Sequence, residues 1–180
     1  MQTEFEIKIL EIDVENMKNK LEKLWAKYIW EKNQKRYVYN FNPASYNKWI
    51  RLRTNGKQTT LCIKDIQDES KIDWTKELEI VVDNFEKTNQ ILEQLWYKSK
   101  AYQENTRISY KLDDCDVELD LRPLIPPYLE IEGPDKESVE KVLEKLNVEN
   151  KTTTSENTTA VYKRYWIEDL EKIKELKFEK

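Results

Sequence analysis

The chain has 180 residues, of which 37% are charged and 11% aromatic, and its formal net charge is −4 at pH 7. This composition is too aromatic for a disordered chain, and it lacks the basic excess that is typical of nucleic-acid-binding proteins. Histidine is absent and there are only two glycines. A Ser-His triad, a histidine zinc site, a P-loop and a dinucleotide-binding loop are therefore excluded.

The two cysteines, Cys62 and Cys115, form neither a disulfide framework nor a metal-binding spacing. No apolar run near the N-terminus resembles a signal peptide, and no segment is long enough to span a membrane. We therefore expect a cytoplasmic protein with one domain over residues 1–170 and a charged tail over 171–180. It is expected to be a monomer or homodimer without nucleic-acid or membrane partners.

The first predicted element is a strand of strictly alternating character. Glu4, Glu6 and Lys8 fall on one face, and the apolar side chains between them fall on the other. Asp13 is a suitable N-cap for a helix predicted over residues 14–29, whose apolar stripe would cover a sheet.

Seven further strands are predicted along the chain. They lie at 35–41, 49–53, 59–64, 76–82, 102–110, 115–121 and 128–132. Asn55-Gly56 favours a hairpin turn between two of them. Further helices are predicted from Asp83 or Asn84, after Gly133-Pro134, and over residues 160–175.

Most of these strands carry charges on one face and apolar side chains on the other. Paired acids recur on four strands, and basic side chains recur between them, namely Lys8, Arg51, Arg53, Lys64 and Arg107. If the helices cover the apolar faces, the charged faces must line something else. Eight antiparallel strands can form a barrel just wide enough for one small ligand. We therefore predict an α+β fold, an eight-stranded antiparallel closed β-barrel (tunnel) with a charged interior and flanking helices.

Inward-facing neighbours on one strand lie about 6.6 Å apart, two residues at about 3.3 Å each. Glu4 with Glu6, and Glu130 with Glu132, could therefore hold an ion between them. Magnesium prefers oxygen ligands and often bridges carboxylates to phosphate oxygens. Arginine forks bind phosphate with two parallel hydrogen bonds. This pattern is typical of a site for a divalent cation together with a polyanion.

The order of these motifs resembles the CYTH superfamily, also called the triphosphate tunnel metalloenzymes. The resemblance covers about residues 2–166 and rests on the following run: Glu4-x-Glu6-x-Lys8, Arg51-x-Arg53, Lys64, Glu77-x-Glu79, Arg107, Asp120 and Glu130-x-Glu132. The superfamily includes class IV adenylate cyclases, thiamine triphosphatases and inorganic triphosphatases. It implies a tunnel that binds a triphosphate with Mg²⁺ or Mn²⁺.

The resemblance also implies roles for individual residues. Lys8, Arg51, Arg53, Lys64 and Arg107 would bind the triphosphate, and Lys163 or Arg164 would add a basic contact. Glu4, Glu6, Asp120, Glu130 and Glu132 would hold metal, with Glu77 and Glu79 as further candidates. Glu77 and Glu79 are candidate proton acceptors, because neighbouring acids would raise the pKa of such a carboxylate, and Lys8 is included among the candidate catalytic residues.

Three functions agree with this pattern. The first is metal-dependent hydrolysis of inorganic tripolyphosphate, a nucleoside triphosphate or thiamine triphosphate. The second is class IV adenylate cyclase, which makes cyclic AMP and pyrophosphate from ATP. The third is a module that binds a polyphosphate or nucleotide without turning it over. A sandwich whose charged face is merely solvated is the remaining alternative.

Overall fold

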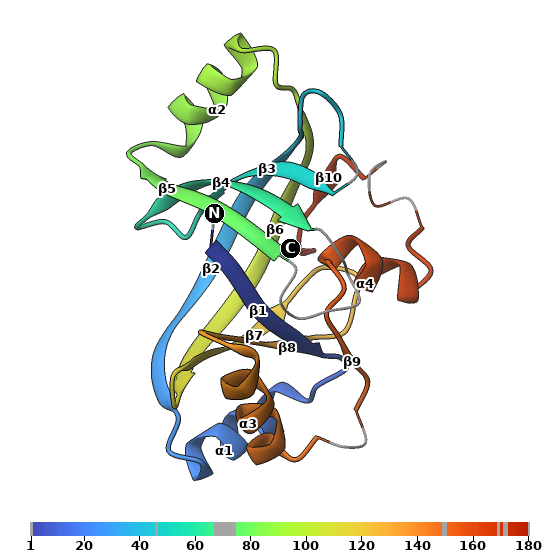
Figure 1. Cartoon of the computed structure of the whole chain (residues 1–180). Coiled ribbons are helices and arrows are strands. Elements are labelled where there is room, and N and C mark those ends of the chain that lie inside the picture. Colours follow the sequence, from blue (N-terminus) through green and yellow to red (C-terminus); the bar gives the residue numbers. More distant parts are fainter. Residues whose placement is uncertain are drawn as a thin grey trace.

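The computed structural model describes residues 2–45, 47–66, 75–148, 151–168, 170 and 173–179. These residues form ten strands and four helices, which confirms the α+β class (Figure 1). The strands are β1 (Gln2–Ile9), β2 (Lys27–Asn40), β3 (Lys48–Thr54), β4 (Thr59–Ile66), β5 (Thr75–Val82), β6 (Ser99–Leu112), β7 (Cys115–Leu121), β8 (Tyr128–Gly133), β9 (Thr153–Thr154) and β10 (Glu175–Leu176). The helices are α1 (Val14–Lys23), α2 (Phe85–Gln94), α3 (Lys136–Leu146) and α4 (Thr158–Arg164).

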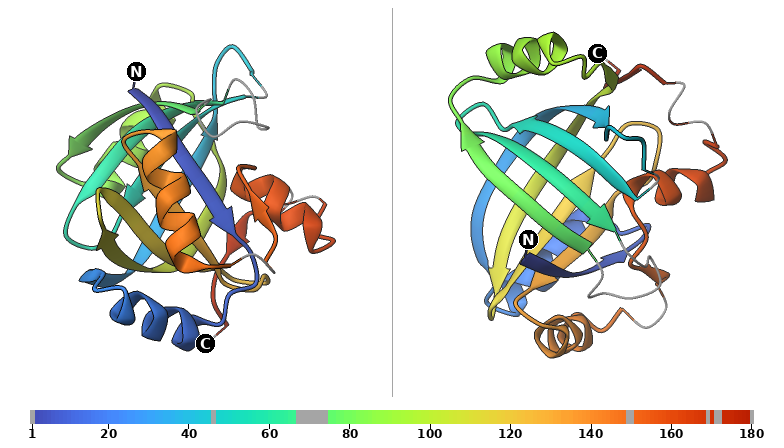
Figure 2. Two further views of the ribbon diagram at one scale, coloured as in Figure 1. Left: turned by 60° about the horizontal axis from the view of Figure 1, so that its bottom comes forward. Right: turned by 45° about the horizontal axis from the view of Figure 1, so that its top comes forward.

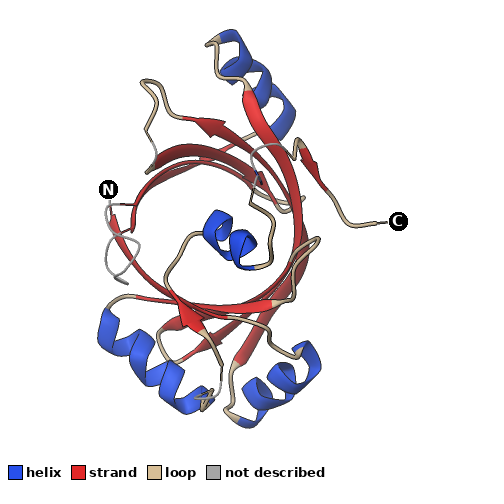
Figure 3. Ribbon diagram, turned by 90° about the vertical axis from the view of Figure 1, so that its right-hand side faces the viewer, coloured by secondary structure: helices blue, strands red, loops and turns tan. Residues whose placement is uncertain are grey.

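All eight expected strands are present, as β1 to β8, and they pair antiparallel. In spatial order they run β6, β2, β3, β4, β5, β1, β8 and β7, and β7 also pairs with β6. Each of the eight therefore has two antiparallel neighbours within this set. The strands curve around a common centre, so the sheet has an inner and an outer face (Figure 3).

The outer face carries the apolar side chains, as the alternation predicts. The largest cluster joins Met17 and Leu21 of α1 and Val142 of α3 to apolar side chains of β1, β6, β7 and β8, including Leu119 and Ile131. Both helices lie on the outside of the sheet (Figure 2). Burial of this cluster holds β1, β7 and β8 in place, and their charged side chains are thereby directed to the inner face.

Helices cover only part of the outer face. Helix α2 packs against β2 and β3, where Leu92 meets Tyr39, Ile50 and Leu52. On β5, Leu78 and Ile80 also lie on the outer side but stay 52% and 54% exposed. The expectation that helices cover the apolar faces is therefore wrong for Leu78 and Ile80 of β5, whereas Val82 of the same strand packs against the cluster of α2.

Two predicted helices are shorter than expected. Helix α1 ends at Lys23 rather than 29, because Trp25 adopts a left-handed backbone conformation with φ 59° and β2 begins at Lys27. Helix α4 covers 158–164 rather than 160–175, and Trp166 likewise has φ 64°. In both helices the apolar residues of the sequence keep a helical spacing beyond the tryptophan, but the left-handed backbone at that tryptophan ends the helix.

The segment after α4 returns to the sheet. Glu175–Leu176 forms β10, which pairs parallel with β6, and Leu176 is 2% exposed. This parallel pair is an exception to the antiparallel arrangement predicted. Helix α4 itself lies over one end of the curved sheet (Figures 1 and 3). Among the described residues, no helix has the length and apolar character needed to cross a membrane.

Candidate active site

The inner face encloses two cavities that meet in the middle. The larger has a volume of about 1060 Å³, and the smaller, of about 370 Å³, is bounded by α4. Both are lined by the same five charged residues at the middle, Glu6, Arg51, Lys64, Arg107 and Glu130. The charged face predicted from the alternation is therefore a lining rather than an outer surface.

The two cavities differ in charge. We call the larger one the acid-rich cavity, because its described lining includes seven carboxylates, those of Glu6, Glu77, Glu79, Asp116, Glu118, Glu130 and Glu132, and five cations, those of Lys32, Arg51, Arg53, Lys64 and Arg107. We call the smaller one the base-rich cavity. Its described lining includes eight cations and only the two carboxylates of Glu6 and Glu130, the cations being Lys8, Arg36, Arg51, Lys64, Lys100, Arg107, Arg122 and Lys163.

Three acids stand side by side across neighbouring strands in the acid-rich cavity. Glu132 of β8 pairs with Glu6 of β1 on one side and with Asp116 of β7 on the other. Like charges directly opposite each other destabilise a sheet. Burial, and then the charge of Glu130, raises the pKa of Glu132 to about 7. Glu6 is paired with Lys8 at 3.0 Å and Asp116 with Lys111 at 3.2 Å, so Glu132 is the acid of this row for which the described residues supply no cationic partner.

This donor set fits a hard divalent cation. Within the described residues, no hydrogen bond or ion pair is found for Glu132, which lies opposite Glu6 and Asp116 on the two neighbouring strands. Oxygen ligands of this kind suit Mg²⁺ and Mn²⁺. Of the other predicted metal ligands, Glu4 belongs to β1, but its side chain lies outside the described residues.

Lys8 and Arg107 each form ion pairs with more than one carboxylate of the inner face. Lys8 Nζ lies 3.0 Å from Glu6 and 3.3 Å from Glu130, and Arg107 contacts Glu118, Asp120 and Glu130. Burial alone would lower the pKa of Lys8, but the two glutamates raise it above its usual value. Both cations are therefore held charged among the carboxylates, Arg107 where the two cavities share their lining and Lys8 on the base-rich side.

Asp120, another predicted metal ligand, is fully buried and already occupied. Its carboxylate accepts hydrogen bonds from Arg107 (2.7 Å), from Asn105 (2.9 Å) and from Arg122. Burial would raise the pKa of Asp120, but Arg122 and Arg107 lower it. In this arrangement Asp120 orients two guanidinium groups, and a metal ion would have to compete with them.

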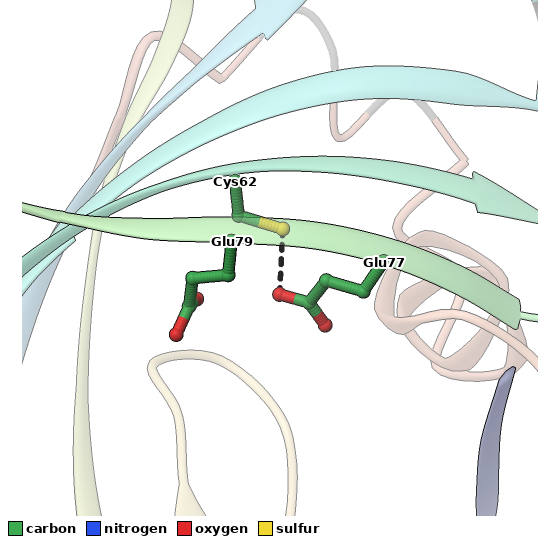
Figure 4. A group of neighbouring side chains, drawn as sticks. All are labelled: Cys62, Glu77 and Glu79. Atoms are coloured by element: carbon green, nitrogen blue, oxygen red, sulfur yellow. Dashed lines mark hydrogen bonds between the residues drawn. The ribbon is translucent and has the colours of Figure 1, made fainter. Parts of the chain in front are cut away.

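Glu77 and Glu79 lie on the wall formed by β5, with Cys62 of β4 beside them (Figure 4). Cys62 Sγ and one oxygen of each carboxylate lie within 4.8 Å of one another, close enough for a shared metal ion, and the thiol donates to Glu77. Arg51 Nη2 is 2.9 Å from Glu77 and 3.3 Å from Glu79. The neighbours of these two carboxylates are therefore mainly cations, and not the acids expected from the sequence.

The remaining predicted cations reach the lining, with one exception. Lys64 contacts Glu77 at 3.2 Å, and Arg53 lies 3.6 Å from Glu79. Lys163 of α4 lines the base-rich cavity. Arg164 instead bonds to Glu156 at 2.6 Å and borders neither cavity. Of the two basic residues that the sequence left as alternatives, Lys163 therefore borders a cavity and Arg164 does not.

Six charged residues of the lining were not among the predicted site residues, namely Lys32, Arg36, Lys100, Asp116, Glu118 and Arg122. Arg36 of β2 and Arg122, which follows β7, border the base-rich cavity, and Glu118 borders the acid-rich one. Burial raises the pKa of Glu118, although Arg107 opposes this effect. For Asp116 and Glu118 the sequence carried a signal, because they alternate with Asp120 along β7, and Arg122 continues the same spacing just after the strand ends.

Comparisons with known proteins agree with this architecture. The family model described as the CYTH domain matches residues 2–162. A conserved hypothetical protein from Pyrococcus furiosus is 24% identical, over 83% of this chain and 94% of that one, with a TM-score of 0.72. No match to a curated protein was found.

Two further solved structures are similar at lower identity. A candidate adenylyl cyclase from Hippeastrum, described as revealing a dominant triphosphatase activity, is 16% identical over 91% of this chain and 96% of that one, with a TM-score of 0.65. A candidate adenylate cyclase from Vibrio parahaemolyticus is 14% identical over 92% and 89%, with a TM-score of 0.64. At these identities the solved structures support the fold alone. The match over residues 2–162 shows that the chain belongs to the CYTH domain family.

Proposed function

We propose that this protein hydrolyses a triphosphate with the help of Mg²⁺ or Mn²⁺ and releases one phosphate. The observation that carries the proposal is the pair of joined cavities, one short of positive charge and the other short of negative charge. A divalent cation bound to a polyphosphate chain would satisfy both. A metal ion alone would neutralise only the acid-rich cavity, and a polyanion alone would neutralise only the base-rich one.

The proposal includes a closed tunnel formed by β1 to β8. It is supported by the pairing of β7 with β6 and by the two antiparallel neighbours of each strand. A closed lining keeps bulk water away from the charges, so that interactions with phosphate oxygens are stronger than they would be at an open surface.

Glu6, Glu130 and Glu132 would hold the metal ion, with Glu4 and Asp120 as further candidates. When bound, the ion would offset charge on the phosphate oxygens and lower the pKa of a bound water. Lys8 sits between Glu6 and Glu130, at 3.0 and 3.3 Å. It is therefore positioned to contact a phosphate oxygen next to the metal site and to stabilise the charge that develops during transfer.

The other cations would bind and orient the phosphate chain. Arg51, Lys64 and Arg107 line both cavities, so a chain that runs from one to the other passes all three. Arg53 lines the acid-rich side. Glu77 or Glu79, on the wall of the same cavity, would accept the proton of the attacking water, with Arg51, at 2.9 and 3.3 Å, orienting the two carboxylates in place of the neighbouring acids expected from the sequence.

The test is a panel of tripolyphosphate, ATP and thiamine triphosphate, each with Mg²⁺ and with Mn²⁺, in which phosphate, pyrophosphate and cyclic AMP are measured separately. We expect metal-dependent release of phosphate, and a loss of about 100-fold or more in Glu130→Gln, as for removal of one charge-stabilising group. Glu140→Gln is the matched control, because Glu140 lies on α3 and its side chain is 55% exposed.

The products distinguish the competing functions. Cyclic AMP with pyrophosphate would favour the cyclase, which the same metal and cations could serve. Tight binding without any product would favour a binding module. Release of phosphate that does not depend on Glu130 would overturn the assignment of this site.

A further inference from the structure

Two arginines of the base-rich cavity have guanidinium groups with one donor each that is left unpaired among the described residues. Arg36 and Arg122 are each only 5% exposed, and both border the base-rich cavity. Arg36 Nε and Arg122 Nη1 are buried and have no hydrogen-bond partner among the described residues. Buried polar groups of proteins are nearly always hydrogen-bonded, so each unpaired donor calls for an acceptor.

The negative charge near these two arginines is also too small. Arg36 Nη2 donates to the neutral side-chain amide of Asn105, and no ion pair is found for Arg36 in the described part of the chain. Arg122 shares the carboxylate of Asp120 with Arg107, with Arg122 Nε 3.1 Å from that group. Asp120 is therefore the carboxylate nearest to both Arg122 and Arg36, and it is shared with Arg107, which also contacts Glu118 and Glu130. A buried cation without a counterion is strongly unfavourable.

Packing explains the position of Arg122 but not that of Arg36. Arg122 Nε donates to the Tyr128 hydroxyl at 2.7 Å, and its guanidinium lies 5.7 Å from the Tyr128 ring. Arg36 has no such support, and burial and then the charge of Arg122 lower its pKa below the ordinary value. Arg36 therefore costs the unliganded protein stability, which is expected of a group kept for binding and not for folding.

We propose that Arg36 and Arg122 form an anion subsite that binds the unsubstituted terminal phosphoryl group of a polyphosphate chain. A terminal phosphoryl group carries nearly two negative charges at neutral pH and accepts several hydrogen bonds, which matches two arginine forks. The subsite lies in the cavity bounded by α4 and is joined to the acid-rich cavity through Arg51, Lys64 and Arg107. The phosphate end thus points toward α4. This inference deepens the proposed function and rests on it only for the kind of ligand.

The test measures binding without catalysis. Isothermal titration calorimetry in EDTA compares tripolyphosphate, ATP and inorganic phosphate on the full chain. Arg36→Gln should weaken tripolyphosphate binding about tenfold or more, because it removes charged hydrogen bonds to the ligand. Arg36→Lys keeps the positive charge but not the planar guanidinium group. Its affinity for tripolyphosphate should lie between those of the natural chain and of Arg36→Gln. Lys145→Gln is the control for net charge, because Lys145 pairs with Asp113 outside both cavities and should bind normally.

The melting temperature of the unliganded variant shows whether a weaker affinity results from a folding defect. Because Arg36 lacks a counterion, Arg36→Gln should raise the melting temperature of the unliganded protein while it weakens binding. A lower melting temperature with unchanged affinity would mean a structural arginine and would overturn the proposal. A loss for tripolyphosphate alone supports an inorganic chain as the ligand, whereas an equal loss for ATP extends the ligand to nucleoside triphosphates. No loss for either overturns the subsite. Since no turnover is needed, the subsite can be confirmed even if no triphosphate is hydrolysed.

Discussion

The two cavities of this protein are built from the same strands but have opposite defects in charge. In the acid-rich cavity Glu6, Glu132 and Asp116 stand in a row, and Glu132 has no partner among the described residues. In the base-rich cavity Arg36 and Arg122 keep unpaired donors. Neither defect could be corrected by a small shift of side chains, because the surplus charges lie at different ends. The lining alone therefore leaves charges of both signs without partners, and the proposed ligand, a divalent cation with a polyphosphate chain, would supply counterions to both.

The largest effect should follow from removing the residue that joins the two cavities. Arg107 is 8% exposed and contacts Glu118, Asp120 and Glu130. Arg107→Gln would leave two buried carboxylates, Asp120 and Glu130, and the partly buried Glu118 without their shared cation, and the free energy of unfolding should fall by about 3–5 kcal/mol. Denaturant unfolding measures this change.

Arg164→Gln is the matched control for that experiment. Arg164 pairs with Glu156, and its side chain is 41% exposed. Its loss should change the free energy of unfolding by about 1 kcal/mol or less. Equal effects of the two substitutions would contradict the view that charge is concentrated at the junction.

A smaller and opposite effect is expected at the acid-rich end. Burial and Glu130 raise the pKa of Glu132 from 4.5 to about 7. The folded protein therefore binds this proton more tightly than the unfolded chain. The resulting stability is fully present below pH 4.5 and is lost as the pH rises through 7. Up to about 3 kcal/mol is involved.

Glu132→Gln removes this pH dependence. Without metal, the variant should be more stable than the natural chain at pH 8 and similar to it at pH 5, as measured by denaturant unfolding in EDTA. Mg²⁺ or Mn²⁺ should stabilise the natural chain at pH 8 by mass action, and the variant much less. A variant that is less stable than the natural chain at pH 8 would mean that Glu132 has a favourable partner.

The sequence predicts which face of each strand carries charge, but not which charges meet. The alternation at Glu6 and Lys8 and at Arg51 and Arg53 correctly directs these side chains to the lining. The row of Glu6, Glu132 and Asp116 depends instead on the register between three strands. Register is determined by turns and by packing of the outer face, which a single sequence does not reveal.

The residues missed by sequence reasoning have identifiable reasons. Arg36 precedes Tyr37, Val38 and Tyr39, an aromatic and β-branched run in which alternation is hard to recognise. Arg122 lies one residue beyond the end of β7. The excessive length of the last predicted helix has a backbone cause, since Trp166 is 88% exposed and has φ 64° where periodicity alone predicts continuation.

The smallest expected effect concerns the end of the base-rich cavity at α4. Lys163 borders that cavity but is exposed, whereas its neighbour Arg164 borders neither cavity. A solvated cation contributes little to binding, so Lys163→Gln should weaken tripolyphosphate binding in EDTA only about two- to fivefold. Arg164→Gln should leave the affinity unchanged, because its charge is already paired with Glu156. If the two variants bound equally, the orientation of α4 over the cavity would play no part in binding, and the difference between the two cavities would reside in the strands alone.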